Sequence, residues 1–266
     1  MRADERAGGL AKYAAFARLG FREARAEPGE LLGRVVFFFM ILGVFSAVWR
    51  AVAESAPGAK DPREMLWYIA MTEWVIMSAP MIQFQMAEDI RRGDVAYQIA
   101  RPGSWLGSRL AHGLGAMALR APVMLVVACG AAFFFAGVPA RPERLLIAIG
   151  FGIVATIVMT VFHVAIGVLA FWLGDIMPAY WIWQKLVFVI GGMLLPLQFY
   201  PDVFVRIALM TPFPAFLAGP ASFMTEAPVM SWGRLVGGLA GWLVVGWLLA
   251  SWLFRRAVKT LQVNGG

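Results

Sequence analysis

Stretches of mostly apolar residues recur along the chain and are separated by shorter stretches that hold most of the charges. Six of them run over residues of about 31–52, 65–86, 109–136, 145–173, 179–199 and 235–254. A helix rises 1.5 Å per residue, so about 20 residues cross a hydrocarbon core ~30 Å thick. The pattern therefore predicts an all-α membrane protein with six transmembrane helices, which together occupy residues 31–266.

The first 30 residues differ because acidic and basic side chains are mixed throughout them. Five apolar residues among them recur at helical spacing on one narrow face: Leu10, Tyr13, Ala14, Ala17 and Phe21. Pro28 and Gly29 then interrupt the pattern. We expect residues 1–30 to form a cytoplasmic arm whose helix over 10–27 lies on the membrane surface. A solvated arm is the alternative.

Composition agrees with a membrane protein, since 61% of the residues are hydrophobic and only 15% are charged. A soluble domain has about 45–50% apolar and about 25% charged residues. This excludes a disordered chain, a secreted disulfide scaffold and a soluble nucleic-acid binder, so no nucleic-acid partner is expected. The single cysteine, Cys129, forms no internal disulfide and builds no metal cluster alone.

The distribution of Lys and Arg predicts the orientation. If the N-terminus is inside, fifteen of these residues fall on the cytoplasmic side and seven outside, while Arg120 lies within a span. Both termini should therefore be cytoplasmic. The chain is expected to be a multi-pass membrane protein, surrounded by membrane lipids.

The connection over residues 87–108 is the most polar part of the chain after the arm. It carries Glu88, Asp89, Ile90, Arg91, Arg92, Gly93, Arg101 and Pro102. A tether between two spans could be much shorter. We interpret this loop as a docking element for a soluble partner, and the alternative is a solvated loop that only fixes orientation.

The outer segment over residues 200–232 is apolar but repeatedly interrupted by proline, at Pro201, Pro212, Pro214, Pro220 and Pro228. No uninterrupted piece of it is long enough to span a membrane. We expect short helices that dip into the membrane from the outer side and return. Such backbone persists at membrane depth only where protein or a cavity surrounds it, so the segment is either a structural cap or a gate.

Two charges fall inside predicted spans. Glu73 lies about 13 Å from the outer end of its span and Arg120 about 16 Å from the inner end of the next one. An unpaired charge at this depth costs at least ~2.5–3.5 kcal/mol. We expect Glu73 to pair with Arg120, or both to face a polar cavity, and the role of the pair is either a static link or substrate binding. His163, which has no partner histidine, is expected to be packed and hydrogen-bonded.

Small residues form a ridge in the last span, at Gly233, Gly237 and Gly241. Such ridges permit close helix approach. We expect packing within the subunit, with packing across a dimer as the alternative.

Several kinds of catalytic chemistry are missing from the sequence. No Gly-x-x-x-x-Gly-Lys-Ser/Thr phosphate loop occurs, so the chain does not bind ATP by that route. No Ser/His/Asp constellation has motif context, and the two histidines lack metal-binding spacing. We therefore expect no catalytic residue, no metal and no cofactor in this chain.

Two runs of residues carry a resemblance to a known family. One is Ile90-x-x-Gly93-x-Val95-x-x-x-Ile99-x-Arg101-Pro102, and the other is Gly191-Gly192-Met193-Leu194-Leu195-Pro196-Leu197-Gln198-Phe199-Tyr200-Pro201, followed by Thr211-Pro212-Phe213 and Gly219-Pro220. With the six spans and the N-terminal helix, they resemble the small six-span permeases of ABC-2 type ATP-binding-cassette transporters. The sequence departs from the family pattern at Ala100, where a larger apolar residue is usual.

The resemblance implies a half-transporter. Two identical or homologous permeases would form the membrane domain, and two separate cytosolic ATPase subunits would bind ATP and Mg²⁺ beneath it. The run from Glu88 to Pro102 would be a coupling helix and the 10–27 helix a second contact. Such transporters usually export a lipid, glycan, peptide or hydrophobic drug.

The same resemblance implies a path and a gate, because spans one, two and five face the pathway in the related fold. Candidate path residues, including the two intramembrane charges, are Phe38, Phe39, Phe45, Glu73, Met77, Met81, Arg120, Phe188, Met193 and Leu194. Candidate outer-gate residues are Pro196, Tyr200, Pro201, Pro212 and Phe213. Ordinary lipid or core packing is the alternative at each path position.

Three other classes of function compete with this interpretation. A secondary transporter without an ATPase would call for more intramembrane charge and an internal repeat. A membrane-embedded enzyme would call for a polar catalytic cluster. A structural scaffold would not need the broken 200–232 segment.

Overall fold

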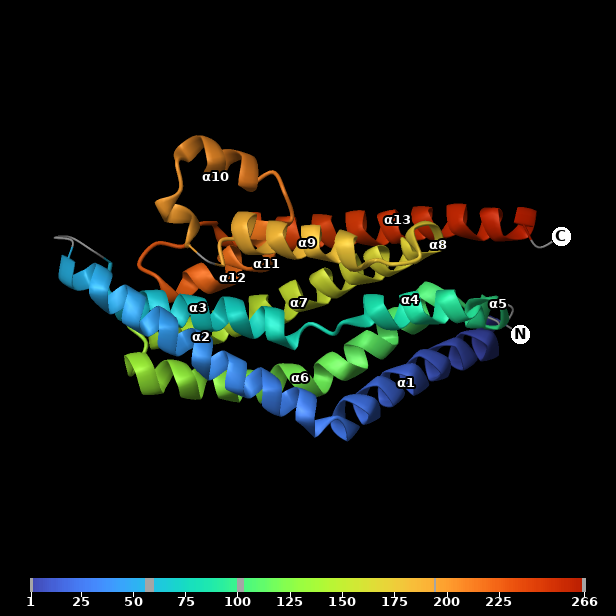
Figure 1. Cartoon of the computed structure of the whole chain (residues 1–266), viewed down its shortest axis with the longest axis horizontal. Coiled ribbons are helices and arrows are strands. Elements are labelled where there is room, and N and C mark those ends of the chain that lie inside the picture. The colour runs from blue at the N-terminus through green and yellow to red at the C-terminus, as the bar shows by residue number, and fades with distance from the viewer. Residues whose placement is uncertain (1, 56–59, 100–102, 194, 265–266) are drawn as a thin grey trace.

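The computed structural model describes residues 2–55, 60–99, 103–193 and 195–264. Within these ranges it consists of helices and their connections, with no strand. The molecule is elongated, and its long helices run along its length (Figure 1). The start of α1 (Arg2–Ala26), the short helix α5 (Asp94–Ile99) and the end of α13 (Trp232–Asn264) lie at one end.

Within the described residues, five segments are long and apolar enough to cross a membrane. They are α2 (Pro28–Ser55), the pair α3 (Pro62–Ser78) and α4 (Ile82–Arg92), α6 (Trp105–Ala136), the run from η1 (Pro142–Arg144) through α7 (Leu145–Val168) and α8 (Ala170–Leu173), and α13. The predicted fifth span over 179–199 is instead α9 (Met177–Ile190), with 14 residues. At 1.5 Å per residue α9 is about 21 Å long, which is less than a hydrocarbon core.

The second predicted span, expected as one helix over 65–86, is broken between α3 and α4. Pro80 has no amide hydrogen to donate, and Ala79 is extended at the end of α3. Arg34 Nη1 donates to the Met77 carbonyl at 2.5 Å, and His163 Nδ1 lies 3.1 Å from the Pro80 carbonyl. Side chains from α2 and α7 thus bind carbonyls that the break leaves free, and His163 is buried and hydrogen-bonded as predicted.

Helix α3 lies at the centre of the bundle. Its side chains Tyr68 and Trp74 are almost completely buried, and Trp74 Nε1 donates to the Ala121 carbonyl of α6 at 2.9 Å. A Cβ at Gly152 of α7 would lie 2.3 Å from the Trp74 ring. The indole therefore fits only because position 152 has no side chain.

Helix α1 packs along the first part of α6 (Figure 1). The backbones approach so closely that a Cβ at Gly20 would lie 2.0 Å from the His112 carbonyl oxygen, and one at Gly115 would lie 1.8 Å from that of Ala17. Glu23 Oε2 lies 2.8 Å from His112 Nε2. Helix α1 is thus packed against α6 and is not a solvated arm. That it lies on the membrane surface remains a prediction.

The outer segment forms short helices, as the prolines predict. They are α10 (Asp202–Ala208), α11 (Phe213–Phe216), α12 (Ala218–Ala221) and η3 (Ser222–Met224). Residues 213–225 are buried against the long helices, whereas α10 stands away from the bundle (Figure 1) and exposes Val203 and Ile207. Residues 213–225 are thus packed in protein, whereas α10 is not; whether the segment dips into a membrane remains a prediction.

The glycine ridge of α13 does not pack within the subunit, contrary to expectation. A Cβ at Gly233, Gly237 or Gly241 would meet no atom within 4 Å. Helix α13 instead faces α7 through Leu239, Gly246 and Ala250, which lie on another side of the helix. The spacing of the glycines was compatible with close packing but did not reveal which side faces the bundle.

Candidate functional site: a membrane cavity and a charged helical turn

A cavity of about 680 Å³ lies between α2, α3, α7 and α9. Its walls include Phe37, Ile41, Glu73, Ile76, Met77, Met81, Met159, His163, Tyr180, Trp183, Gln184, Val187, Phe188 and Met193. Phe37 and Met81 are 40% and 45% exposed, so the cavity reaches the molecular surface. The break between α3 and α4 contributes part of the cavity wall through Ala79 and Met81.

Glu73 is the residue of this cavity whose carboxyl group has no polar partner among the residues that the structure describes. It lines the wall and is 2% exposed. Across the described ranges, no hydrogen bond or ion pair involves its carboxylate. The predicted pair with Arg120 is therefore wrong. The other option, that both face a polar cavity, holds only for Arg120, which lines a second cavity, whereas the cavity at Glu73 is mostly apolar.

Arg120 pairs with Glu30 instead, at 2.5 Å between Nη2 and Oε2. The other carboxylate oxygen of Glu30 accepts from Arg34 Nη2 at 2.7 Å, and Arg34 also binds the Met77 carbonyl. Three helices are thus joined through one carboxylate. Compatible depth suggested Glu73 as the partner, but depth does not specify which side of a helix a residue occupies.

A second, polar cavity of about 220 Å³ lies on the other side of Glu30, between α1, α4 and α6. Its lining includes Glu23, Glu27, His112 and Arg120. Glu30 lines both cavities, so the Glu30–Arg34–Arg120 group forms part of the wall between them. Sequence reasoning missed Glu30 and Arg34, because charges near the start of a span read as orientation signals.

The charged turn at the end of α4 leads into α5. Gly93 ends α4 in the left-handed conformation at φ 78°, which a residue with a side chain rarely adopts. Glu88 accepts from Arg92 at 2.7 Å and also from Arg91. These exposed ion pairs and Tyr97, which is 78% exposed, form the outward face of the turn.

The inward side of the same turn is firmly attached. Asp89 pairs with Arg109 of α6 at 2.6 Å, and Gln98 accepts from Trp105 Nε1 at 2.7 Å and also from Arg109. Val95 is 2% exposed, in a cluster with residues of α4, α6, α7 and α13. Helix α5 is therefore a rigid part of the bundle with one exposed face.

The turn after α9 supports the outer segment. Gly192 has φ 76°, and its carbonyl accepts from Tyr68 Oη at 2.6 Å. The Gly191 carbonyl accepts from the amide of Ala218 at 3.1 Å. The end of α9, the centre of α3 and α12 are thus connected directly.

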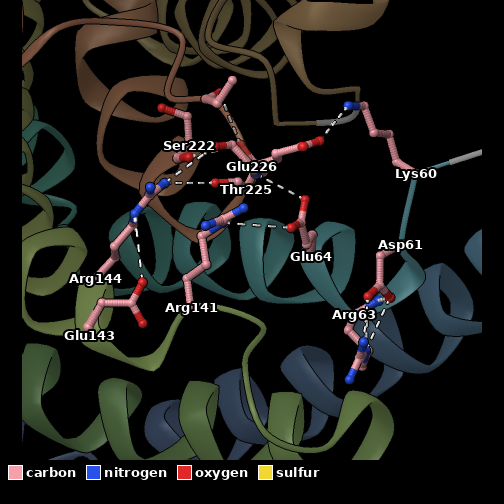
Figure 2. A network of polar contacts seen from close by, with 11 residues as sticks. Lys60, Asp61, Arg63, Glu64, Arg141, Glu143, Arg144, Ser222, Thr225 and Glu226 are labelled. Carbon is pink, nitrogen blue, oxygen red and sulfur yellow. Dashed lines mark hydrogen bonds and ion pairs between the residues drawn. The ribbon is translucent and has the colours of Figure 1, made fainter.

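A network of polar contacts fixes the other end of the outer segment (Figure 2). Glu64 of α3 accepts from the Glu226 amide at 3.0 Å, and its other oxygen lies 4.0 Å from Arg141. Arg144 donates to the Thr225 carbonyl at 3.2 Å. Nearby, hydrogen bonds from Arg63 hold the pKa of Asp61 below its usual range. The segment is anchored to α3 and to the α6–α7 connection.

Comparison with protein-family models matches residues 62–265 to the ABC-2 family transporter protein. This is more than half of the chain. The chain belongs to the ABC-2 transporter family. A comparison with curated proteins finds no match. Family membership and the long apolar helices make it a multi-pass membrane component of a transporter, and this component is not itself the catalytic part.

The ABC-2 chain places its candidate path residues in three environments. Glu73, Met77, Met81, Phe188 and Met193 line the large cavity. Phe38 is fully buried in the core, Phe45 packs against it, and Phe39 lies beside Phe135. Leu194 lies outside the described residues. A role in translocation remains a prediction for all of them.

Sequence reasoning named only Phe188 from the α9 wall of the cavity and missed the other residues of that wall. Tyr180, Trp183 and Val187 recur at helical spacing and line it together. That spacing was visible in the sequence and would have indicated one shared face.

The coupling and gate residues of the ABC-2 chain are placed as follows. Glu88 to Gly93 form the end of α4, and Arg101 and Pro102 lie outside the described residues. Pro196 precedes η2 (Leu197–Phe199), Pro201 precedes α10, and Pro212 precedes α11. Phe213 is buried, and the Tyr200 ring stacks on Phe204 at 4.6 Å. Their functions remain predictions.

Proposed function

We propose that this chain is the membrane subunit of an ATP-driven ABC-2 exporter in the bacterial inner membrane. It works with a second identical or homologous permease and with cytosolic ATPase subunits, which supply the ATP and Mg²⁺ sites. Its substrate is hydrophobic or amphipathic: a lipid, glycan, peptide or drug. The turn from α4 into α5, with one anchored and one exposed face, is the observation that carries this proposal.

The attachment of the turn supports a role in coupling. Asp89, Val95 and Gln98 bind it to the bundle, so a push on its exposed face is transmitted to α4 and α6 rather than absorbed locally. A solvated loop that only fixes orientation would not need these contacts. The exposed Tyr97 is a suitable anchor for a partner, since aromatic residues dominate interface energies.

The termini support the orientation. The start of α1 and the end of α13 lie at the same end of the molecule as α5, and α9 runs back from α8 towards α10 (Figure 1). If α9 and the turn after it complete a crossing, the chain crosses an even number of times and both ends lie on one side, which the distribution of Lys and Arg makes the cytoplasmic one. The anchored outer segment at the opposite end then serves as the outer gate, with Gly191 and Gly192 at its junction with α9.

Co-purification tests the proposal. The chain is expressed with its neighbouring genes, extracted in mild detergent, and its companions are identified by mass spectrometry. We expect a stoichiometric soluble protein that carries a phosphate loop. Replacing Tyr97 with Ala should reduce its recovery by about fivefold or more, because truncation of an interface anchor costs ~1 kcal/mol or more.

The matched control is Val203→Ala, since Val203 is similarly exposed but lies on α10 at the opposite end. This variant should recover the ATPase like the unchanged chain. If no ATPase is recovered under conditions that preserve other membrane complexes, the proposal fails.

The second candidate is an ATPase-independent secondary transporter. The unpaired carboxylate of Glu73 in the large cavity favours it, because such transporters place ionisable groups on the substrate path. Substrate movement driven by an ion gradient in vesicles that contain this chain without an ATPase would support this alternative.

A further inference from the structure

One carboxyl group of the large cavity, that of Glu73, forms no ion pair with any described residue on its walls. Of its charged lining residues, Glu30 and Arg34 pair with each other at 2.7 Å. Arg34 also donates to the Met77 carbonyl, so its guanidinium is occupied. Glu73 is the remaining charged group of the lining, and it is without a partner in the described chain.

His163, which lies close to the break between α3 and α4, also offers a hydrogen-bond acceptor. A carbonyl oxygen only accepts, so the contact of His163 Nδ1 with the Pro80 carbonyl at 3.1 Å places a hydrogen on Nδ1. In the neutral ring, Nε2 is then an acceptor. The cavity thus offers a carboxylate and a ring nitrogen to a donor, and its arginine is already bound.

The remaining wall is mostly aromatic and apolar, with Gln184 as a further polar residue. Phe37, Tyr180, Trp183 and Phe188 come from α2 and α9. Aromatic faces attract cations as well as apolar bodies. Lys185 Nζ lies 5.9 Å from the Phe188 ring, although Lys185 is not part of the lining. The volume of about 680 Å³ suits a drug-sized molecule.

We infer that this cavity binds an organic cation with a bulky apolar body, whose cationic centre lies beside the Glu73 carboxylate and whose body packs against Trp183, Tyr180 and Phe37. The inference rests on the proposed function in one respect: it narrows the substrate class of the path that the exporter would use. Membership of the ABC-2 family does not specify the charge of a substrate, so the inference goes further than that membership.

Binding by the full chain in lipid nanodiscs tests the inference. The probes are tetraphenylphosphonium and tetraphenylborate, which have the same shape and opposite charge. We expect the cation to bind in preference to the anion. Glu73→Gln should weaken cation binding by about tenfold or more, since an interaction with a charged group is worth ~1.5–3 kcal/mol. Glu73→Asp should retain part of the affinity.

The matched control is Glu54→Gln, which removes an exposed carboxylate at the end of α2, outside the cavity. It should bind the cation normally. All variants must elute as single species from a sizing column and unfold near the temperature of the unchanged chain. Equal binding of both probes, or full cation affinity in Glu73→Gln, overturns the inference.

Two further experiments identify the source of the cation and distinguish a failure of this inference from a failure of the proposed function. Nanodiscs with and without phosphatidylethanolamine test whether an ammonium lipid occupies the site, because such a lipid would compete with the probe. Binding is measured without an ATPase. Charge-selective binding by a chain that captures no ATPase therefore supports the inference while the proposed function fails, and the reverse result overturns only the inference.

Discussion

Glu30 is the residue that connects most of the polar interior. One carboxylate joins Arg34 on its own helix to Arg120 on α6, and Arg34 continues to α3 through the Met77 carbonyl. Both arginines are almost completely buried. Removal of the carboxylate would leave two like charges close together in a region of low polarity, where unpaired charges are expensive.

A double-mutant cycle measures this connection. Glu30→Gln and Arg120→Gln should show a coupling free energy of about 0.5–3 kcal/mol, as contacting residues in one network do. Glu73→Gln and Arg120→Gln should be additive within about 0.5 kcal/mol, because these two side chains do not pair. Unfolding in mixed micelles supplies the free energies. Strong coupling of Glu73 with Arg120 would contradict the observed pairing.

At the scale of elements, the crossing of α1 and α6 depends on glycine in both helices. The Gly20 and Gly115 positions admit the opposite backbone, so even a methyl group would separate the helices. The break between α3 and α4 shows the complementary case, in which Pro80 opens a helix and neighbouring side chains satisfy its carbonyls. Close packing and helix interruption together place the walls of both cavities.

Gly115→Ala tests the crossing. The new Cβ would lie 1.8 Å from the Ala17 carbonyl oxygen, so the helices must shift apart, and the overpacking should cost about 1–3 kcal/mol of stability. Gly130→Ala on the same helix is the control, since no atom lies within 4 Å of its Cβ. That variant should be neutral or gain up to about 1 kcal/mol from helix propensity. Equal stability of the two variants would refute the crossing.

At the scale of the whole molecule, the two ends of the bundle differ in character. One end carries α5, the start of α1 and the end of α13, and the other carries the short helices of the outer segment (Figure 1). The polar cavity lies between α1, α4 and α6, and the large cavity lies beyond Glu30. A path between the ends would pass the group formed by Glu30, Arg34 and Arg120.

Cysteine labelling tests the orientation. In a Cys129→Ala background, Val203→Cys should react with a membrane-impermeant thiol reagent in intact cells, and Tyr97→Cys only after permeabilisation. Both positions are well exposed. A C-terminal tag should be protected from external protease, as an even number of crossings requires. An accessible tag together with a protected N-terminus would favour five crossings.

Much of this architecture could be predicted from the apolar pattern. Five of the six expected spans recur as segments long and apolar enough to cross a membrane, one of them as the broken pair α3 and α4. The prolines of the outer segment correctly indicated short helices. Proline and apolar length act locally, through the missing amide hydrogen and the thickness of the membrane. For the same reason the all-helical class was accessible from the sequence alone.

Only the tertiary structure decided which charged side chains pair and which side of each helix faces the bundle. Arg120 binds Glu30, although Glu73 lies at a compatible depth. The reason is that packing against several neighbours at once sets the rotation of each helix about its own axis. The ridge at Gly233, Gly237 and Gly241 points away from the bundle for the same reason. The sequence by itself determined which segments are helical and apolar, whereas contacts between distant helices determined which charges meet and which one, Glu73, is left facing a cavity.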